Sequence, residues 1–238
     1  MNWKVENRGF PKLKMLLCVL LVSLAAPLLA QEQDWANLGK YAEANAKLAA
    51  PSPEENRVVF MGNSITEKWE TYDSAFFATN PYINRGISGQ VTSQMLLRFR
   101  PDVIELQPKV VVILAGTNDI AQNKGPISIE QIAGNIFSMA ELAKANGIKV
   151  VLAAALPATS YSWRPNIKPA DSIVALNKLI KKYAKENKLV YVDYYKPMVN
   201  KEKGLKKEYG RDSVHPSLEG YKVMESLVVK AITKALNK

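Results

Sequence analysis

The stretch VVFMGNSITEKW, residues 58–69, decides the fold. Its first four residues are apolar and have the length and composition of a buried strand. Gly62, Asn63 and Ser64 follow at once, and the residues after them are compatible with a helix. A buried strand that runs through small polar residues into a helix is typical of an α/β domain. The stretch therefore predicts that Ser64 lies on a sharp turn at the end of a strand.

The same alternation continues along the chain. Short apolar runs rich in β-branched residues are separated by longer segments with helical spacing of apolar residues. Such strands, each followed by a helix, favour a mostly parallel sheet covered by helices on both faces. No repeat or low-complexity linker divides the chain, so we expect one domain over residues 54–238. The predicted strands are 57–61, 82–87, 109–115, 148–155 and 189–193, and the clearest predicted helices are 128–146, 170–187 and 217–236.

The first thirty residues have the pattern of a secretory signal. A basic segment, 1–14, precedes the apolar segment 15–30, which is short for a membrane span. We therefore predict a signal peptide over 1–30, cleaved after Ala30, and an exported protein that is periplasmic or extracellular. An uncleaved membrane anchor is the alternative. The residues that follow, 31–53, are Ala-rich up to their prolines and are predicted to form an N-terminal helical extension.

Composition and charge narrow the function classes. Signal cleavage would remove Cys18, the only cysteine of the 238-residue chain, so stability must come from a buried core instead of disulfide bonds. The net charge is +10, and residues 1–30 carry +3 of it, which leaves about +7. The lysines are scattered, and no basic strand with interleaved aromatic residues accompanies them. We therefore expect no nucleic-acid partner, and no stable membrane insertion after signal cleavage.

Polar and glycine-rich segments follow the predicted strands. In an open parallel sheet, ligands bind in the crevice beyond the carboxyl ends of the strands, so these segments are where chemistry is expected. They are GNS at 62–64, NRGISGQ at 84–90, GTND at 116–119 and LPATSYSWRPN at 156–166, and DSVHP at 212–216 precedes the last helix.

His215 is the only histidine in the chain. Asp212 lies three residues earlier, so within a single turn its carboxylate can reach one imidazole nitrogen. Pro216 ends that turn and is expected near the first position of the last helix. The pair could also be half of a metal site, but no second histidine and no mature cysteine could complete it. We therefore interpret His215 as a base and Asp212 as the group that orients it.

Ser64 is the candidate nucleophile, because a serine hydroxyl needs a base to take its proton and His215 could serve. The alternative is that Ser64 only caps the following helix. Acyl transfer also needs donors aimed at the oxyanion. The candidates are the N–H groups of Ser64 and Gly89 and the side-chain amide of Asn118.

These segments together resemble the motif blocks of the SGNH hydrolases, also called GDSL-type esterases, lipases and acylhydrolases. The four blocks appear in order as GNSI at 62–65, GISGQ at 86–90, GTND at 116–119 and DSVHP at 212–216. The resemblance covers residues 57–225. It implies a three-layer α/β/α sandwich, the flavodoxin-like SGNH fold, with a central, mostly parallel five-stranded sheet, and it implies no metal and no cofactor.

The resemblance also implies the role of each site residue. It makes Ser64 the nucleophile, His215 the base and Asp212 its orienting group. It makes Ser64, Gly89 and Asn118 the oxyanion hole. Asn63 is a departure, because the family usually has aspartate there, but asparagine makes similar hydrogen bonds in turns.

The predicted reaction is ester hydrolysis through an acyl-enzyme. Flat aromatic rings and arginine donors suit sugar rings, so Trp163 and Arg164, with Arg85 and Asn63 near other blocks, are candidate substrate contacts. Trp69 also lies close to one of the blocks, and the alternative is that Trp163 and Trp69 only pack over the crevice. We therefore favour a secreted esterase that removes small acyl groups, acetyl above all, from a small-molecule or polysaccharide ester. The rival hypotheses are a lysophospholipase or thioesterase, and a non-catalytic carbohydrate-binding protein; the oligomeric state is not predicted.

Overall fold

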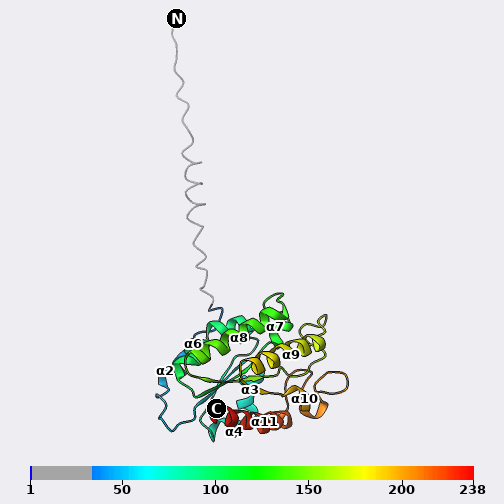
Figure 1. Ribbon diagram of the computed structural model, residues 1–238. Coiled ribbons are helices and arrows are strands. Elements are labelled where there is room, and N and C mark those ends of the chain that lie inside the picture. Colours follow the sequence, from blue (N-terminus) through cyan, green and yellow to red (C-terminus); the bar gives the residue numbers. More distant parts are fainter. Residues whose placement is uncertain (2–33) are drawn as a thin grey trace. The chain divides into compact units, whose positions relative to one another are not determined.

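Five parallel strands form the centre of the described part of the computed structural model (Figure 1). Their order across the sheet is β2-β1-β3-β4-β5, so the chain reverses direction across the sheet after β2. The prediction of a parallel five-stranded sheet is confirmed, and every strand lies within the predicted range or within one residue of it. The strands are β1 (Val58–Gly62), β2 (Tyr82–Gly86), β3 (Val110–Leu114), β4 (Lys149–Ala153) and β5 (Val190–Val192).

The structure describes residues 1 and 34–238. Residues Trp35–Lys238 form one unit, and the account below concerns this unit alone. The predicted signal peptide over 1–30, with Cys18 and the cleavage after Ala30, lies outside the described residues.

Helices cover both faces of the sheet (Figure 1). One face carries α3 (Ser64–Tyr72), α4 (Ser74–Ala78) and α11 (Leu218–Leu236). The other carries α5 (Thr92–Leu97), α6 (Phe99–Asp102), α8 (Ile129–Ala145) and α9 (Ala170–Glu186). The shorter elements are α2 (Ala42–Lys47), α7 (Thr117–Ile120), α10 (Tyr195–Met198) and two 3₁₀ turns, Ile104–Leu106 and Lys207–Tyr209.

The side chains of β1 show why this stretch decides the fold. Because successive strand residues point to opposite faces, Val59 and Met61 enter the core under α8, whereas Val58 and Phe60 enter the core under α11. All four are at most 2% exposed. Burying apolar side chains on both faces stabilises the fold by roughly 1.5–3 kcal/mol for each side chain. A charge at any of these positions would lie inside a core.

The predicted boundaries of α8 are confirmed by its caps. The Ser128 hydroxyl accepts a hydrogen bond from the N–H of Gln131 at 3.2 Å, and the Gln131 side chain accepts one from the N–H of Ser128 at 3.0 Å. Gly147 follows the helix with a φ of 73°, a conformation that favours glycine.

The N-terminal segment differs from the prediction of a helical extension over 31–53. Of its described residues, only those of α2 are helical, and residues 35–41 form turns in which Asn37 has a φ of 54°. The physical reason is that backbone groups there are hydrogen-bonded to the domain instead of within a helix: the carbonyl of Ala36 accepts from the Gln90 side chain at 2.7 Å. Residues 35–53 therefore pack on the domain and belong to the same unit.

Gly62 is needed for the close packing of α3 on β1, because a Cβ there would lie 2.0 Å from Thr66 Oγ1. One local expectation was wrong. Pro216 is not in the first turn of α11. Ser217 caps that helix by accepting from the N–H of Gly220 at 3.3 Å, so Pro216 precedes the cap.

Candidate active site

Ser64 lies where the sequence predicts, on the turn between β1 and α3. It is the first residue of α3, and its neighbour Asn63 is the cap: Asn63 Oδ1 accepts from the N–H of Ile65 at 3.0 Å. Asn63 is 1% exposed, so its side chain braces the turn from inside and does not face a substrate. The N–H of Ser64 is in the first helical turn, whose N–H groups have no acceptor within the helix.

The imidazole of His215 lies beside Ser64, although the two residues are 151 positions apart in the sequence. Ser64 Oγ is 3.0 Å from His215 Nε2. On the other side of the ring, His215 Nδ1 lies 2.9 Å from Asp212 Oδ2 and 3.1 Å from Oδ1. A nucleophile within hydrogen-bond reach of a base, and a base oriented by a carboxylate, is an arrangement that can move a proton from Ser64 to His215.

Asp212 is fixed by the turn on which it lies. Its Oδ1 accepts from the N–H of Val214 at 2.8 Å and from the N–H of His215 at 2.7 Å. Partial burial alone would raise the pKa of Asp212. The hydrogen bonds from these two N–H groups and from the imidazole outweigh it and hold the pKa below the usual range. Asp212 is therefore ionised at neutral pH.

Three strand ends are hydrogen-bonded to one another beside Ser64. The N–H of Ile87, after β2, donates to the carbonyl of Gly62 at 3.1 Å. The Asn118 side chain, after β3, donates from Nδ2 to the carbonyl of Gln90 at 2.9 Å. Gly89 lies between Ile87 and Gln90, is exposed, and has a φ of 77°. The predicted oxyanion donors therefore lie on segments that contact one another directly.

Trp163 and Arg164 lie beside this centre. The Trp163 ring is 41% exposed, and its centroid is 6.5 Å from that of His215. Arg164 is exposed and donates to the carbonyl of Gln122 at 3.4 Å. Both residues border a hollow of about 480 Å³, whose other lining residues include Gln122, Pro165 and Asn166.

Arg85 and Trp69 are placed differently from the expectation. Arg85 is 7% exposed, and its Nη2 and Nε donate to Asn45 Oδ1 at 2.7 and 3.0 Å, while the Tyr41 ring lies 4.7 Å from its Cζ. Its guanidinium is therefore held inside the fold by the N-terminal segment, away from a substrate. Trp69 is 1% exposed and packs on Phe60, so it is a core residue.

Sequence reasoning missed residues that hold these loops. Arg98 is fully buried and donates to the carbonyls of Gly62 and Arg85, at 3.1 and 2.9 Å, which ties the ends of β1 and β2 together. Glu67 accepts from the N–H of Ser88 at 2.8 Å and from its hydroxyl, which braces the turn before Gly89. Their spacing in the sequence carries no motif that would have revealed these roles.

Asp119, the residue after Asn118, is a buried titratable group. It is 1% exposed and accepts hydrogen bonds from the N–H of Thr92 at 3.0 Å and from its hydroxyl at 2.5 Å. Burial disfavours the charged form and raises the pKa of Asp119 to about 6, although the bonds from Thr92 oppose the shift.

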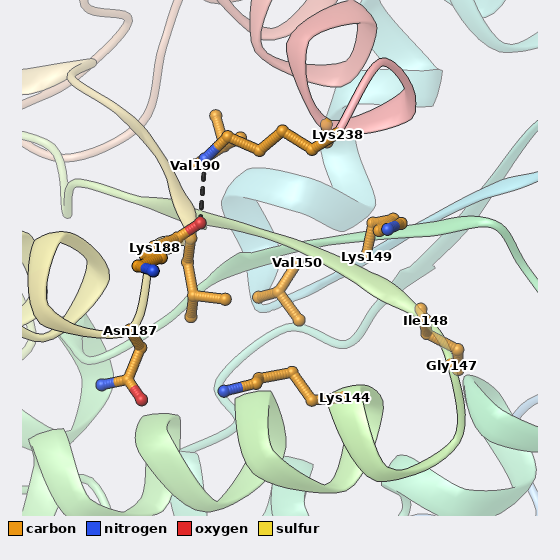
Figure 2. A pocket seen from close by; sticks show the side chains of 11 residues that line it. Lys144, Gly147, Ile148, Lys149, Val150, Asn187, Lys188, Val190 and Lys238 are labelled. Atoms are coloured by element: carbon orange, nitrogen blue, oxygen red, sulfur yellow. Dashed lines mark hydrogen bonds between the residues drawn. The ribbon is translucent and has the colours of Figure 1, made fainter.

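A larger cavity of about 570 Å³ lies elsewhere, at the amino ends of β4 and β5 (Figure 2). Figure 2 shows Val150 between Lys144, from the end of α8, and Lys238, whose Nζ donates to the carbonyl of Lys188 at 2.8 Å. Lysines near helix C-termini are favoured by the helix dipole, which accounts for these charges. The cavity lies at the amino ends of the strands, whereas Ser64 follows the carboxyl end of β1, so the cavity is not part of this centre.

Two further observations concern the described residues alone. No group of three or more His, Cys, Asp or Glu side chains there is arranged to hold a metal ion. None of the helices there is both long and apolar enough to cross a membrane.

The sequence pattern of the GDSL-like lipase/acylhydrolase family matches residues 60–223, a range that includes Ser64, Gly89, Asn118, Asp212 and His215. The chain belongs to this family, the SGNH hydrolases. A GDSL-like lipase structure from Bacteroides thetaiotaomicron is 54% identical, with a TM-score of 0.83 over 85% of this chain and 100% of the other. A more distant acetyl xylan esterase is 22% identical, with a TM-score of 0.63 over 74% of this chain and 98% of the other; that likeness shows the fold alone.

Two curated relatives match parts of this SGNH hydrolase. The esterase TesA of Pseudomonas aeruginosa is 31% identical over 136 residues, which are 57% of this chain and 61% of that protein. The uncharacterized lipoprotein YqeF of Bacillus subtilis is 36% identical over 78 residues, which are 32% of each protein. The matches therefore span about three fifths and one third of these relatives.

Proposed function

We propose that this chain is a secreted serine esterase that removes small acyl groups, acetyl above all, from carbohydrate. The observation that carries the proposal is the 3.0 Å contact between Ser64 Oγ and His215 Nε2, with the far side of the imidazole held by Asp212. A serine beside a base whose other nitrogen is oriented by a carboxylate is an activated nucleophile. Family membership supports acyl transfer as the reaction.

The mechanism follows from these contacts. Ser64 Oγ attacks the ester carbonyl carbon while His215 Nε2 takes the hydroxyl proton. The tetrahedral intermediate collapses, the bond to the alcohol oxygen breaks, and the alcohol leaves with the proton from His215. Water then gives a proton to His215 and attacks the acyl-enzyme, which releases the acid and restores Ser64. Asp212 remains ionised and stabilises the imidazolium in both halves.

The oxyanion of both intermediates needs fixed donors. We assign this role to the N–H groups of Ser64 and Gly89 and to Nδ2 of Asn118. The amide nitrogen of Asn118 carries two hydrogens, and the carbonyl of Gln90 takes one of them, so one remains for the oxyanion. Such donors stabilise the transition state because charge develops where they already point.

The surroundings favour a polar alcohol part and a short acyl part. The hollow of about 480 Å³ beside Trp163 is lined by polar groups of Gln122, Arg164 and Asn166. An exposed indole face beside amide and guanidinium donors suits a sugar ring and its hydroxyls. We therefore propose Trp163 and Arg164 as contacts to the carbohydrate. A long acyl chain would need an apolar channel, which this hollow does not offer.

The test is hydrolysis of p-nitrophenyl acetate, butyrate and octanoate by residues 31–238 and by the Ser64→Ala variant. We expect turnover of acetate that is lost in the variant, and then turnover of acetylated oligosaccharides. A preference for octanoate would refute the small-acyl assignment and favour the lysophospholipase or thioesterase hypothesis. If neither the wild type nor Ser64→Ala turns over any ester and both bind sugar with equal affinity, the chain is a carbohydrate-binding protein and not an enzyme.

Export is the remaining part of the proposal. It rests on the predicted signal over 1–30 and gains support from the lipoprotein relative of Bacillus subtilis. Mass spectrometry of the mature protein should find Gln31 as the first residue. A mature chain that keeps residues 1–30 and sediments with membranes would instead support the uncleaved anchor.

A further inference from the structure

Three side chains form a continuous chain of hydrogen bonds from the surface loop to Asn118. Trp163 Nε1 donates to Asn123 Oδ1 at 2.9 Å. Asn123 Nδ2 donates to Asn118 Oδ1 at 3.1 Å, and Asn118 Nδ2 donates to the carbonyl of Gln90 at 2.9 Å. The N–H of Asn123 also donates to the backbone carbonyl of Asn118 at 3.0 Å, so the two asparagines are held at two points.

The groups at the two ends of this series of hydrogen bonds determine which atom of each amide donates and which accepts. An indole N–H can only donate, so the amide of Asn123 must present its oxygen to Trp163. The nitrogen of Asn123 then faces Asn118, which must present its own oxygen in return. At the other end, the carbonyl of Gln90 can only accept, so it selects the same orientation of Asn118. Both ends therefore turn Nδ2 of Asn118, and not Oδ1, toward Gln90.

We propose that Asn123 is a positioning residue of the oxyanion hole, and that Trp163 sets the orientation of Asn123. The proposal rests on the function proposed above, because it acts through Asn118. An inverted Asn118 amide would present an acceptor where a donor is needed, and would repel the developing oxyanion instead of stabilising it. Asn123 touches no reacting atom, so it acts on the rate only through the residues that carry the oxyanion donors: Asn118 above all, and Gly89, whose carbonyl lies 3.5 Å from Asn123 Nδ2.

The outer end of the chain lies where a substrate can touch it. Trp163 is 41% exposed, borders the hollow and has its ring centroid 6.5 Å from that of His215. Asn123 is half-buried behind it. The same indole therefore has two functions in the proposal: its ring, stacked on Tyr161 and partly exposed, contacts the alcohol part of the ester, and its N–H orients Asn123.

The decisive variant is Asn123→Asp, which keeps the size of the side chain but removes its donor. The introduced carboxylate can still accept from Trp163, but it opposes the oxygen of Asn118 and favours the inverted amide. Asn123→Ala removes the donor without this repulsion. Asn237→Asp is the matched control, because it adds the same charge at an exposed asparagine at the C-terminal end of α11, outside the candidate active site and the hollow. Asn118→Ala gives the loss of kcat that follows when this oxyanion donor is removed altogether.

We expect kcat for p-nitrophenyl acetate to fall roughly 100-fold or more in Asn118→Ala, the usual loss of one oxyanion donor. Asn123→Asp should lower kcat about 10- to 100-fold with KM changed less than about 3-fold, because both chemical steps pass through an oxyanion. Asn123→Ala should lose about 3- to 10-fold, and Asn237→Asp less than about 2-fold. Thermal melting of each variant checks that the fold is intact.

Trp163→Phe tests the outer link, because it keeps an aromatic ring and removes the N–H. It should lower kcat about 2- to 5-fold in the wild-type background and have no further effect in the Asn123→Ala background, as expected for residues that act through one another. Additive losses would overturn the role of Trp163.

Asn118→Ala separates this inference from the proposed function. If it lowers kcat while Asn123→Asp and Asn123→Ala are both as active as the wild type, the positioning role of Asn123 is wrong and the oxyanion hole stands. If Asn118→Ala leaves kcat unchanged, both the oxyanion role of Asn118 and this inference fail.

Discussion

Replacing Arg98 by methionine should unfold this protein at a much lower temperature. Its guanidinium is fully buried and donates to four acceptors: Gln90 Oε1 at 2.5 Å, Asp102 Oδ2 at 2.9 Å, and the carbonyls of Gly62 and Arg85. Methionine fills much of the volume but donates nothing. The substitution therefore leaves a buried carboxylate and two strand-end carbonyls without these donors.

The size of the effect follows from what is left behind. Breaking a buried ion pair by removing one partner costs about 3–5 kcal/mol, because the other charge stays buried. Asp102 is 1% exposed and keeps one donor, the Asn45 side chain at 2.8 Å, which offsets a part of that cost. The carbonyl of Gly62 keeps the N–H of Ile87 as a donor, so the further cost comes from the carbonyl of Arg85, where losing the Arg98 donor adds about 1–3 kcal/mol. We expect a total near 4–6 kcal/mol, which for a domain of this size lowers Tm by about 10–20 °C.

The assay is urea unfolding at pH 7, followed by tryptophan fluorescence, with Arg98→Lys and the double variant Arg98→Met/Asp102→Leu beside it. The lysine variant keeps the charge but loses the fork of donors, so its loss should be intermediate. The double variant removes the stranded carboxylate, so it should be at least about 1 kcal/mol more stable than Arg98→Met. A single variant that loses less than about 1 kcal/mol, or a double variant no better than the single, would refute the reasoning.

Three further outcomes are expected. Asp119, with a pKa raised to about 6, is penalised when ionised in the folded state, so its part of the stability is present below about pH 4 and falls as pH rises to 6. Relative to wild type, Asp119→Asn should therefore gain about 2 kcal/mol in the free energy of unfolding between pH 4 and pH 7, and an unchanged difference would contradict this. Asp212→Asn keeps an oxygen for the two backbone bonds of its turn but loses the charge beside the imidazole, so kcat should fall roughly 10³- to 10⁴-fold at nearly constant KM and Tm; a loss below about tenfold would argue against the orienting role. Gly62→Ala should cost about 1–3 kcal/mol in unfolding experiments, because its Cβ would meet Thr66, whereas the control Gly134→Ala, with open space around it in α8, should be neutral or stabilising.

The strands could be predicted because their signal is local. Each apolar run is bounded by turn residues, and burial on both faces leaves little ambiguity about where a strand such as Val110–Leu114 begins and ends. The same reasoning placed Ser64 and His215 at the same end of the sheet, since parallel strands present their carboxyl ends together. The 3.0 Å contact between them joins residues that are 151 positions apart.

What could not be predicted depends on partners that are distant in sequence. Arg85 looked available to a substrate, because arginine is rarely buried without a partner. Its partner, Asn45, lies 40 positions earlier in a segment whose composition predicted a helix. Asn123 had no signal of its own, because its proposed role arises from side-chain hydrogen bonds to Trp163 and to Asn118, which lie on separate loops. Hydrogen bonds between side chains from separate segments leave no periodic trace in the sequence.

The turn that carries Asp212 and His215 has a consequence for how this centre could diversify. The carboxylate is bonded to backbone N–H groups of its own turn, two and three residues later, so the imidazole is aimed without help from the sheet. Outside its own turn, His215 meets Ser64 Oγ, and Ser213, between the two residues, donates to the carbonyl of Ser160 after β4 at 3.1 Å. The loops after β2 and β3 can therefore differ in length and composition while the contact between Asp212 and His215 stays the same.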